Sequence, residues 1–184
     1  MFIQTEQTPN PATLKFLPGR PVLESGQVEV LDADEAERVS PLARRLFAVE
    51  GVRSVFMAKD FVAVTKQMGA DWYLLKPAVL GAMVEHFMSG EDAIVEQSAP
   101  EPVATVEDDE TVAKIKELLN TRVRPAVAND GGDIVFHGFD RGVVYLHMKG
   151  ACAGCPSSVV TLKNGIENLL RYYVPDVVEV RAID

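Results

Sequence analysis

The sequence predicts an α+β protein of two small domains joined by a flexible acidic linker. Segments with strand-like and helix-like patterns occur throughout the 184 residues. Residues 91–106 break this pattern, because they are rich in Pro, Ala and acidic residues and have no periodic apolar face. An apolar fraction of 47% is sufficient for a buried core. We therefore expect a first domain over residues 1–90, a linker over 91–106, and a second domain over 107–184 that forms a small sheet covered by helices.

The first domain is expected to contain a sheet and two helices. Alternating or apolar runs predict strands at Phe2–Gln7, Thr13–Leu17, Gly26–Leu31, Val52–Ala58 and Phe61–Lys66. Ser40 is a good helix cap and Pro41 suits the first helical position, so a helix begins here and ends at Gly51. A second helix over Trp72–Met88 contains Pro77, which we expect to kink it.

The second domain is expected to begin with a helix over Asp109–Val123. Acidic residues occupy its first turn, which suits the positive end of the helix dipole, and Pro125 is expected to stop it. A turn and a hairpin should follow, with strands at Ile134–Phe139 and Val143–Lys149. Apolar residues at 3-4-3-4 spacing then predict a helix over Pro156–Tyr173, and Val177–Arg181 can close the sheet.

The charge pattern excludes some classes of partner. The net charge is −9, and eight acidic residues but no Lys or Arg lie between Ser89 and Glu110. The rest of the chain then holds 19 of the 27 acidic residues against 18 basic ones, with no basic stripe, so we expect no nucleic-acid partner. No apolar run approaches the roughly 20 residues of a membrane helix, and no secretory signal is recognisable. We expect no membrane association and a cytoplasmic (bacterial) location; a processed mitochondrial matrix form also fits.

The only two cysteines, Cys152 and Cys155, lie in one loop. A C-x-x-C pair supplies two soft sulfur ligands, which is half of the set that a tetrahedral metal or an iron–sulfur cluster takes. Pro156 suits the first helical position, which places Cys155 at the N-cap, where the helix dipole lowers the pKa of a thiol. The neighbouring Gly and Ala residues are small, so we expect poorly shielded sulfurs and an open site.

Three interpretations of this pair remain open from the residues alone. The favoured one is an iron–sulfur carrier, in which two chains each give Cys152 and Cys155 to one cluster at a symmetric interface. The second is a dithiol-disulfide oxidoreductase, because a C-x-x-C before a helix is also the thioredoxin arrangement. The third is a zinc-binding module completed by His147, His137 or a second chain. His86 follows the apolar face of a predicted helix and is expected to be a packing or surface residue.

Three stretches together carry a resemblance to a known family. They are Gln7-Thr8-Pro9-Asn10-Pro11-Ala12-Thr13-Leu14-Lys15-Phe16, Arg124-Pro125-Ala126-Val127-Ala128-Asn129-Asp130-Gly131-Gly132-Asp133 and Gly150-Ala151-Cys152-Ala153-Gly154-Cys155-Pro156-Ser157-Ser158. In this order they resemble Nfu-type proteins: the first is similar to the start of the N-terminal Nfu domain, and the other two to the domain shared with the C-terminus of NifU. The resemblance covers nearly the whole chain.

The resemblance implies a carrier or scaffold and not an enzyme, so no catalytic residue is expected. It implies that Cys152 and Cys155 are the metal and cofactor ligands, and that one [4Fe-4S] cluster, or alternatively a [2Fe-2S] cluster, bridges two subunits. The first domain has no cysteine, and the family suggests that it recognises clients. The implied partners are a second copy of the chain when the cluster is bound, apo iron–sulfur client proteins, and upstream cluster-assembly scaffolds.

Overall fold

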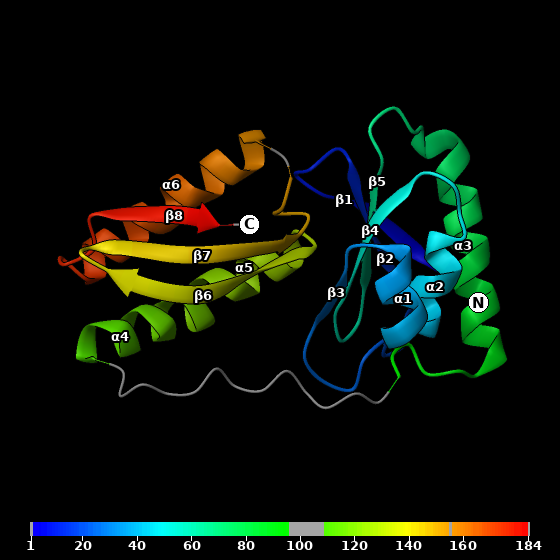
Figure 1. Ribbon diagram of the computed structural model, residues 1–184, viewed down its shortest axis with the longest axis horizontal. Coiled ribbons are helices and arrows are strands. Elements are labelled where there is room, and N and C mark those ends of the chain that lie inside the picture. Colours follow the sequence, from blue (N-terminus) through cyan, green and yellow to red (C-terminus); the bar gives the residue numbers. More distant parts are fainter. Residues whose placement is uncertain (1, 96–108, 155, 184) are drawn as a thin grey trace. The chain divides into compact units, whose positions relative to one another are not determined.

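The computed structural model describes residues 2–95, 109–154 and 156–183, with the backbone alone at 156–158. The chain divides into two compact units, Met1–Ala99 and Pro100–Asp184 (Figure 1). Both units contain helices and strands, and the second is a small sheet with helices, so the predicted α+β class is confirmed. The greater part of the predicted linker lies outside the described residues.

The described residues of the first unit form a five-stranded antiparallel sheet and three helices. The strands are β1 (Gln4–Gln7), β2 (Thr13–Leu17), β3 (Val28–Val30), β4 (Val52–Met57) and β5 (Val62–Lys66). The helices are α1 (Ala33–Val39), α2 (Pro41–Phe47) and α3 (Trp72–Ser89). The strand order is β1-β2-β5-β4-β3, so β1 and β3 form the two edges. A strand forms at each of the five predicted places.

Helix α1 was missed in the sequence, although its start carries a recognisable signal. The Asp32 carboxylate accepts a hydrogen bond from the Glu35 N–H at 2.7 Å, and the Glu35 carboxylate accepts one from the Leu31 N–H at 3.0 Å. The arrangement is similar to a capping box, except that Glu35 accepts from the residue before the cap and not from the cap residue itself. The Asp32-Ala33-Asp34-Glu35 spacing could therefore have predicted the helix.

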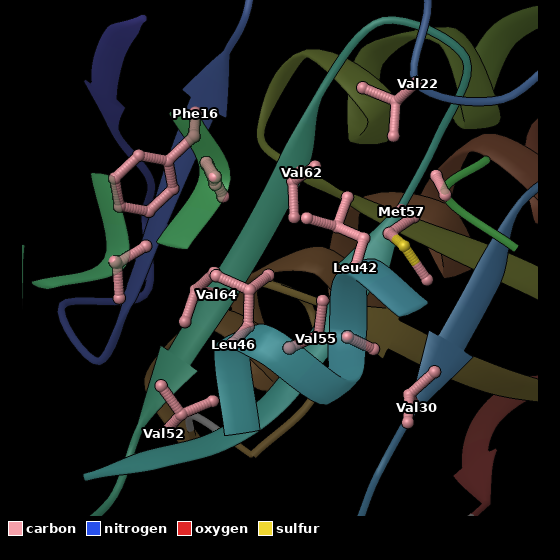
Figure 2. Close-up of a cluster of buried hydrophobic side chains, with 14 of the residues drawn as sticks. Phe16, Val22, Val30, Leu42, Leu46, Val52, Val55, Met57, Val62 and Val64 are labelled. Carbon is pink, nitrogen blue, oxygen red and sulfur yellow. The ribbon is translucent and has the colours of Figure 1, made fainter. Parts of the chain in front are cut away.

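The core of the first unit lies between its helices and one face of its sheet (Figure 2). Strands β4 and β5 direct alternate side chains towards this core, as a pleated sheet requires. The fully buried members from these strands and from α2 are Val55, Met57, Val62, Val64, Leu42 and Leu46. Cross-strand pairing of Val55 with Val64 and of Met57 with Val62 keeps the apolar set on one face.

His86 belongs to the buried face of α3, together with Leu75, Val79 and Met83. The imidazole is fully buried, and neither ring nitrogen has a hydrogen-bond partner within the described residues. Burial lowers the pKa of His86 below its ordinary value of 6.5, and the nearby Arg45 charge acts in the same direction. His86 is thus a packing residue of this unit.

The described part of the second unit contains a three-stranded sheet in the order β6-β7-β8. The strands are β6 (Gly132–Asp140), β7 (Val143–Gly150) and β8 (Glu179–Ile183), and the long helix α6 (Pro156–Tyr173) connects β7 to β8. Strands β6 and β7 pair antiparallel, whereas β7 and β8 pair parallel. The last strand starts at Glu179, two residues later than predicted. Val177 instead closes a turn, because its N–H donates to the Val174 carbonyl, and its side chain is buried.

One core fills the second unit. Burial alternates along β7, where Val144, Leu146 and Met148 face inwards. They pack with residues of two helical segments, one over residues 110–129 and the other α6. These residues are Ile115, Leu118, Leu119, Val127, Ile166 and Leu170. The helices therefore cover the face of the sheet that carries these residues.

The first helical segment of the second unit continues past Pro125, so the prediction that Pro125 ends it is wrong. Helix α4 (Glu110–Leu118), the π-helical turn η1 (Leu119–Val123) and helix α5 (Arg124–Asn129) follow one another directly. In η1 the Arg124 N–H donates to the Leu119 carbonyl, five residues back. A proline ring in an ordinary helix collides with the carbonyl four residues back. The wider π turn relieves that collision, and Pro125 then lies in the first turn of α5, where its missing N–H is not needed.

Candidate functional site

The cysteine loop leaves the sheet at the end of β7 and leads into α6. Gly150, the last residue of β7, has a φ of +61°, a conformation that favours glycine. Three backbone hydrogen bonds hold the loop: Ala151 N–H donates to Gly131 at 3.1 Å, Cys152 N–H to Lys149 at 3.3 Å and Ala153 N–H to Gly150 at 3.1 Å. The loop is therefore built on the end of β7 and on the turn that precedes β6.

Cys152 is buried, with only 6% of its surface exposed, and belongs to the core of the second unit. This corrects the expectation of poorly shielded sulfurs at this position. The cause is a close approach to Gly132, the first residue of β6, which pairs with Gly150. A Cβ atom at Gly132 would lie 2.6 Å from the Cys152 Sγ, 2.7 Å from the Lys149 carbonyl oxygen and 3.0 Å from the Cys152 nitrogen. The small neighbours that suggested openness instead let the backbones close over the thiol.

The Cys155 side chain and its predicted N-cap position lie outside the described residues. The backbone places α6 directly after it, beginning at Pro156 as predicted. Two thiols in one short loop before a helix thus remain the candidate ligand set.

An ion pair that the sequence did not reveal lies beside the loop. Arg124, at the start of α5, donates from Nε to Asp133 Oδ1 and from Nη2 to Asp133 Oδ2, each at 2.9 Å. The hydrogen bonds that Arg124 donates to Asp133 raise the pKa of Arg124 above its usual range. Asp133 directly follows Gly132 and is 1% exposed. The paired residues lie nine positions apart, across a turn, so no helical or strand spacing identifies them.

The histidines proposed for zinc do not assemble a site with other described residues. His147 lies on β7 opposite Val135 of β6 and Ile183 of β8, and it alternates with the inward-facing Met148. His137 lies at the register shift of β6. Across residues 2–95, 109–154 and 156–183, no three His, Cys, Asp or Glu side chains gather closely enough to hold a metal ion. The described residues therefore give the zinc interpretation no support.

The fold and the loop together define a class of two-domain proteins whose second domain carries a cysteine pair between a sheet and a helix. Residues 3–90 match the family described as "Scaffold protein Nfu/NifU N terminal", and residues 115–181 match the "NifU-like domain". The chain is 50% identical over 184 residues to the human "NFU1 iron-sulfur cluster scaffold homolog, mitochondrial", covering 100% of this chain and 72% of that protein. The chain therefore belongs to the Nfu/NifU family of iron–sulfur cluster scaffold proteins.

The chain is also similar to a second named relative and to parts of two solved structures. A protein of the same name from Drosophila ananassae is 50% identical over 185 residues, and the chain covers 64% of its length. A solution structure of a NifU-like protein from Saccharomyces cerevisiae matches 53% of this chain and 87% of its own, with 28% identity and a TM-score of 0.48. A crystal structure of a Staphylococcus aureus protein matches 45% of this chain and 99% of its own, with 26% identity and a TM-score of 0.40.

No helix among the described residues is both long enough and apolar enough to span a membrane.

Proposed function

We propose that this protein carries an iron–sulfur cluster, most simply [4Fe-4S], between two copies of the chain and passes it to apo iron–sulfur proteins. Cys152 and Cys155 of each copy supply the thiolate ligands. The observation that carries the proposal is the count of donors: the sequence has two cysteines, and the described residues offer no metal-binding group of three His, Cys, Asp or Glu. Because a cluster of this type takes four thiolates, a second copy has to provide the other half.

The surroundings of the loop suit a cargo that is taken up and released. The burial of Cys152 means that the loop has to open before its thiolate reaches a cluster. Once it has opened, each chain holds the cluster by two bonds, and client thiolates can replace them by ligand exchange. Separation of the two copies then accompanies release. Dithiol-disulfide exchange is the alternative function, and zinc binding is a third.

The first domain, over residues 1–90, is proposed to recognise client proteins. It has no cysteine and so offers no thiolate ligand, while it has a separate core of its own. Residues 107–184 then form the cluster-binding domain and 91–106 the tether. Upstream assembly scaffolds are proposed as donors, in the bacterial cytoplasm or in a mitochondrial matrix. The relatives compared above are named as mitochondrial proteins.

Anaerobic reconstitution with iron and sulfide tests the cluster assignment. We expect a brown protein whose Mössbauer spectrum identifies a [4Fe-4S] cluster, with [2Fe-2S] as the second outcome consistent with the proposal. A colourless protein that binds one zinc ion per chain would overturn the assignment in favour of a zinc module. Turnover of a disulfide substrate without cluster uptake would overturn it in favour of an oxidoreductase.

A fragment of residues 105–184 tests the role of the first domain. This fragment contains the whole second core, so we expect it to bind the cluster but to deliver it more slowly than the full chain to at least some apo clients. The measurement is the rate of client activation at equal cluster concentration, after circular dichroism has established that the fragment is folded. Equal rates for every client tested would remove the recognition role from residues 1–90.

A further inference from the structure

We infer that the Arg124–Asp133 ion pair is a positioning device for the Cys152 thiol, and this inference rests on the proposed function for its purpose. The pair holds the turn that ends in Gly132, and that turn holds the cysteine loop. Asp133 directly follows Gly132 in the chain, so the pair acts on Cys152 through the backbone.

The pair is built to fix geometry. Both oxygens of Asp133 accept a bond from the Arg124 guanidinium at 2.9 Å, and Asn120 accepts a third bond from Nη1 at 3.2 Å. A buried carboxylate is strongly unfavourable unless it is paired. Because Asp133 is only 1% exposed, its carboxylate depends on its partner Arg124. The ion pair therefore ties the start of β6 to the start of α5. Two parallel bonds fix orientation as well as distance, which a single contact would not do.

The π turn gives Arg124 its place in this arrangement. Asn120 belongs to η1, and Arg124 directly follows η1. An additional residue in a helical turn rotates everything that follows it about the helix axis, and such turns are common at functional sites. The turn therefore sets the direction from which the guanidinium approaches Asp133.

Two contacts transmit the position of this turn to the loop. The Gly131 carbonyl accepts the Ala151 N–H at 3.1 Å, one residue before Cys152. Gly132 lies so close to the Cys152 Sγ that not even one additional carbon atom fits between them. Because Asp133 is the next residue after Gly132, any movement of its backbone changes both contacts. Loss of the pair should therefore uncover the thiol while the rest of the domain remains folded.

The reaction rate of a single thiol tests the inference without requiring any cluster. Cys155→Ser in the full chain leaves Cys152 as the only thiol. In that background we expect Asp133→Asn to speed the reaction of the apoprotein with a maleimide about tenfold or more, since a charge-assisted bond contributes that much to a local opening equilibrium. Arg124→Lys keeps the charge but lacks the planar fork, so it should behave like Asp133→Asn.

Two controls separate positioning from general destabilisation. Glu179→Gln weakens the partly exposed pairs of Glu179 with Lys163 and Arg181 in the same domain. Gly142→Ala strains the opposite end of the β6–β7 hairpin. For each control variant, we expect any change in the maleimide labelling rate of Cys152 to be no larger than the change in its unfolding midpoint explains. Should Arg124→Lys fail to fold, Asp133→Asn still decides the question, because the partly exposed Arg124 can remain hydrated.

The outcomes are distinct from those for the proposed function. Labelling of Asp133→Asn at the parent rate would overturn the positioning role, and so would an equal acceleration in Gly142→Ala at matched stability. Parent-like labelling of Arg124→Lys would overturn the requirement for two parallel bonds. If Asp133→Asn and Arg124→Lys both speed the maleimide reaction of Cys152 but the unaltered chain takes up no cluster, the positioning role stands and the proposed function fails.

Discussion

Gly132→Ala should eliminate most cluster uptake while leaving the second domain folded. The added methyl group would lie 2.6 Å from the Cys152 Sγ and 2.7 Å from the Lys149 carbonyl oxygen, and real side chains do not tolerate such distances. Two of the three nearest atoms belong to the backbone, so the cysteine loop is displaced permanently and can no longer return Cys152 to its place in the ligand pair with Cys155. Inserting a methyl group into a packed site costs about 1–3 kcal/mol of unfolding free energy. The measurements are iron and sulfide content after reconstitution and the chemical unfolding curve.

Gly142→Ala is the matched control for Gly132→Ala. Gly142 lies in the turn at the opposite end of the same hairpin, with a φ of +82°. A methyl group there would lie 2.8 Å from Val178 Cγ2 and 3.0 Å from the Asp176 carbonyl oxygen. We expect a similar loss of stability, about 1–3 kcal/mol, from crowding and backbone strain. Cluster uptake should nevertheless persist. If both variants lose the cluster to the same extent, the effect of Gly132 reflects domain stability and not the position of Cys152.

Cys152→Ala and Cys155→Ala should each abolish cluster binding and the dimerisation that depends on it. Each change removes one ligand per chain and therefore two of the four ligands per cluster. The loss of a sulfur atom from the Cys152 site should cost only about 1 kcal/mol of stability, so the fold should survive. The measurements are visible absorption, iron and sulfide content, and molecular mass in solution after anaerobic reconstitution.

Met148→Leu provides the control for the cysteine variants. Met148 belongs to the same core as Cys152 and is equally buried, at 6% exposure. Its replacement removes a sulfur atom but no thiol, and a swap of this kind conserves volume. Cluster content should match that of the parent protein. Full iron and sulfide per dimer in either cysteine variant would rule out the ligand assignment.

Local signals in the sequence were sufficient for most of the fold. Alternating residues identified the strands β2, β4 and β5, since each side chain on a strand faces either the core or the opposite side. The 3-4-3-4 spacing identified α6. Helix α1 was missed because its seven residues bury only Ala36, which leaves a short helix without an apolar face. Only the Asp32 cap and Glu35 three residues later mark its start.

The features that were not predicted depend on contacts between distant parts of the chain. A proline ends or kinks most helices. Here the π turn that precedes Pro125 allows the helical segment to continue. Small neighbours suggested that Cys152 is accessible, but small residues also allow close packing, and Gly132 comes from another strand. The ion pair of Arg124 with Asp133 spans a turn, and its bidentate form emerges only when α5 and β6 are both in place.

The stoichiometry of the reconstituted protein tests the central claim most directly. Native mass spectrometry, combined with iron and sulfide analysis, reports how many chains share one cluster. The proposal predicts one [4Fe-4S] cluster on two chains of 20.1 kDa each, with a coordination shell divided equally between them. A full cluster held by one chain, or a stable two-chain species saturated with zinc in place of iron and sulfide, would contradict it.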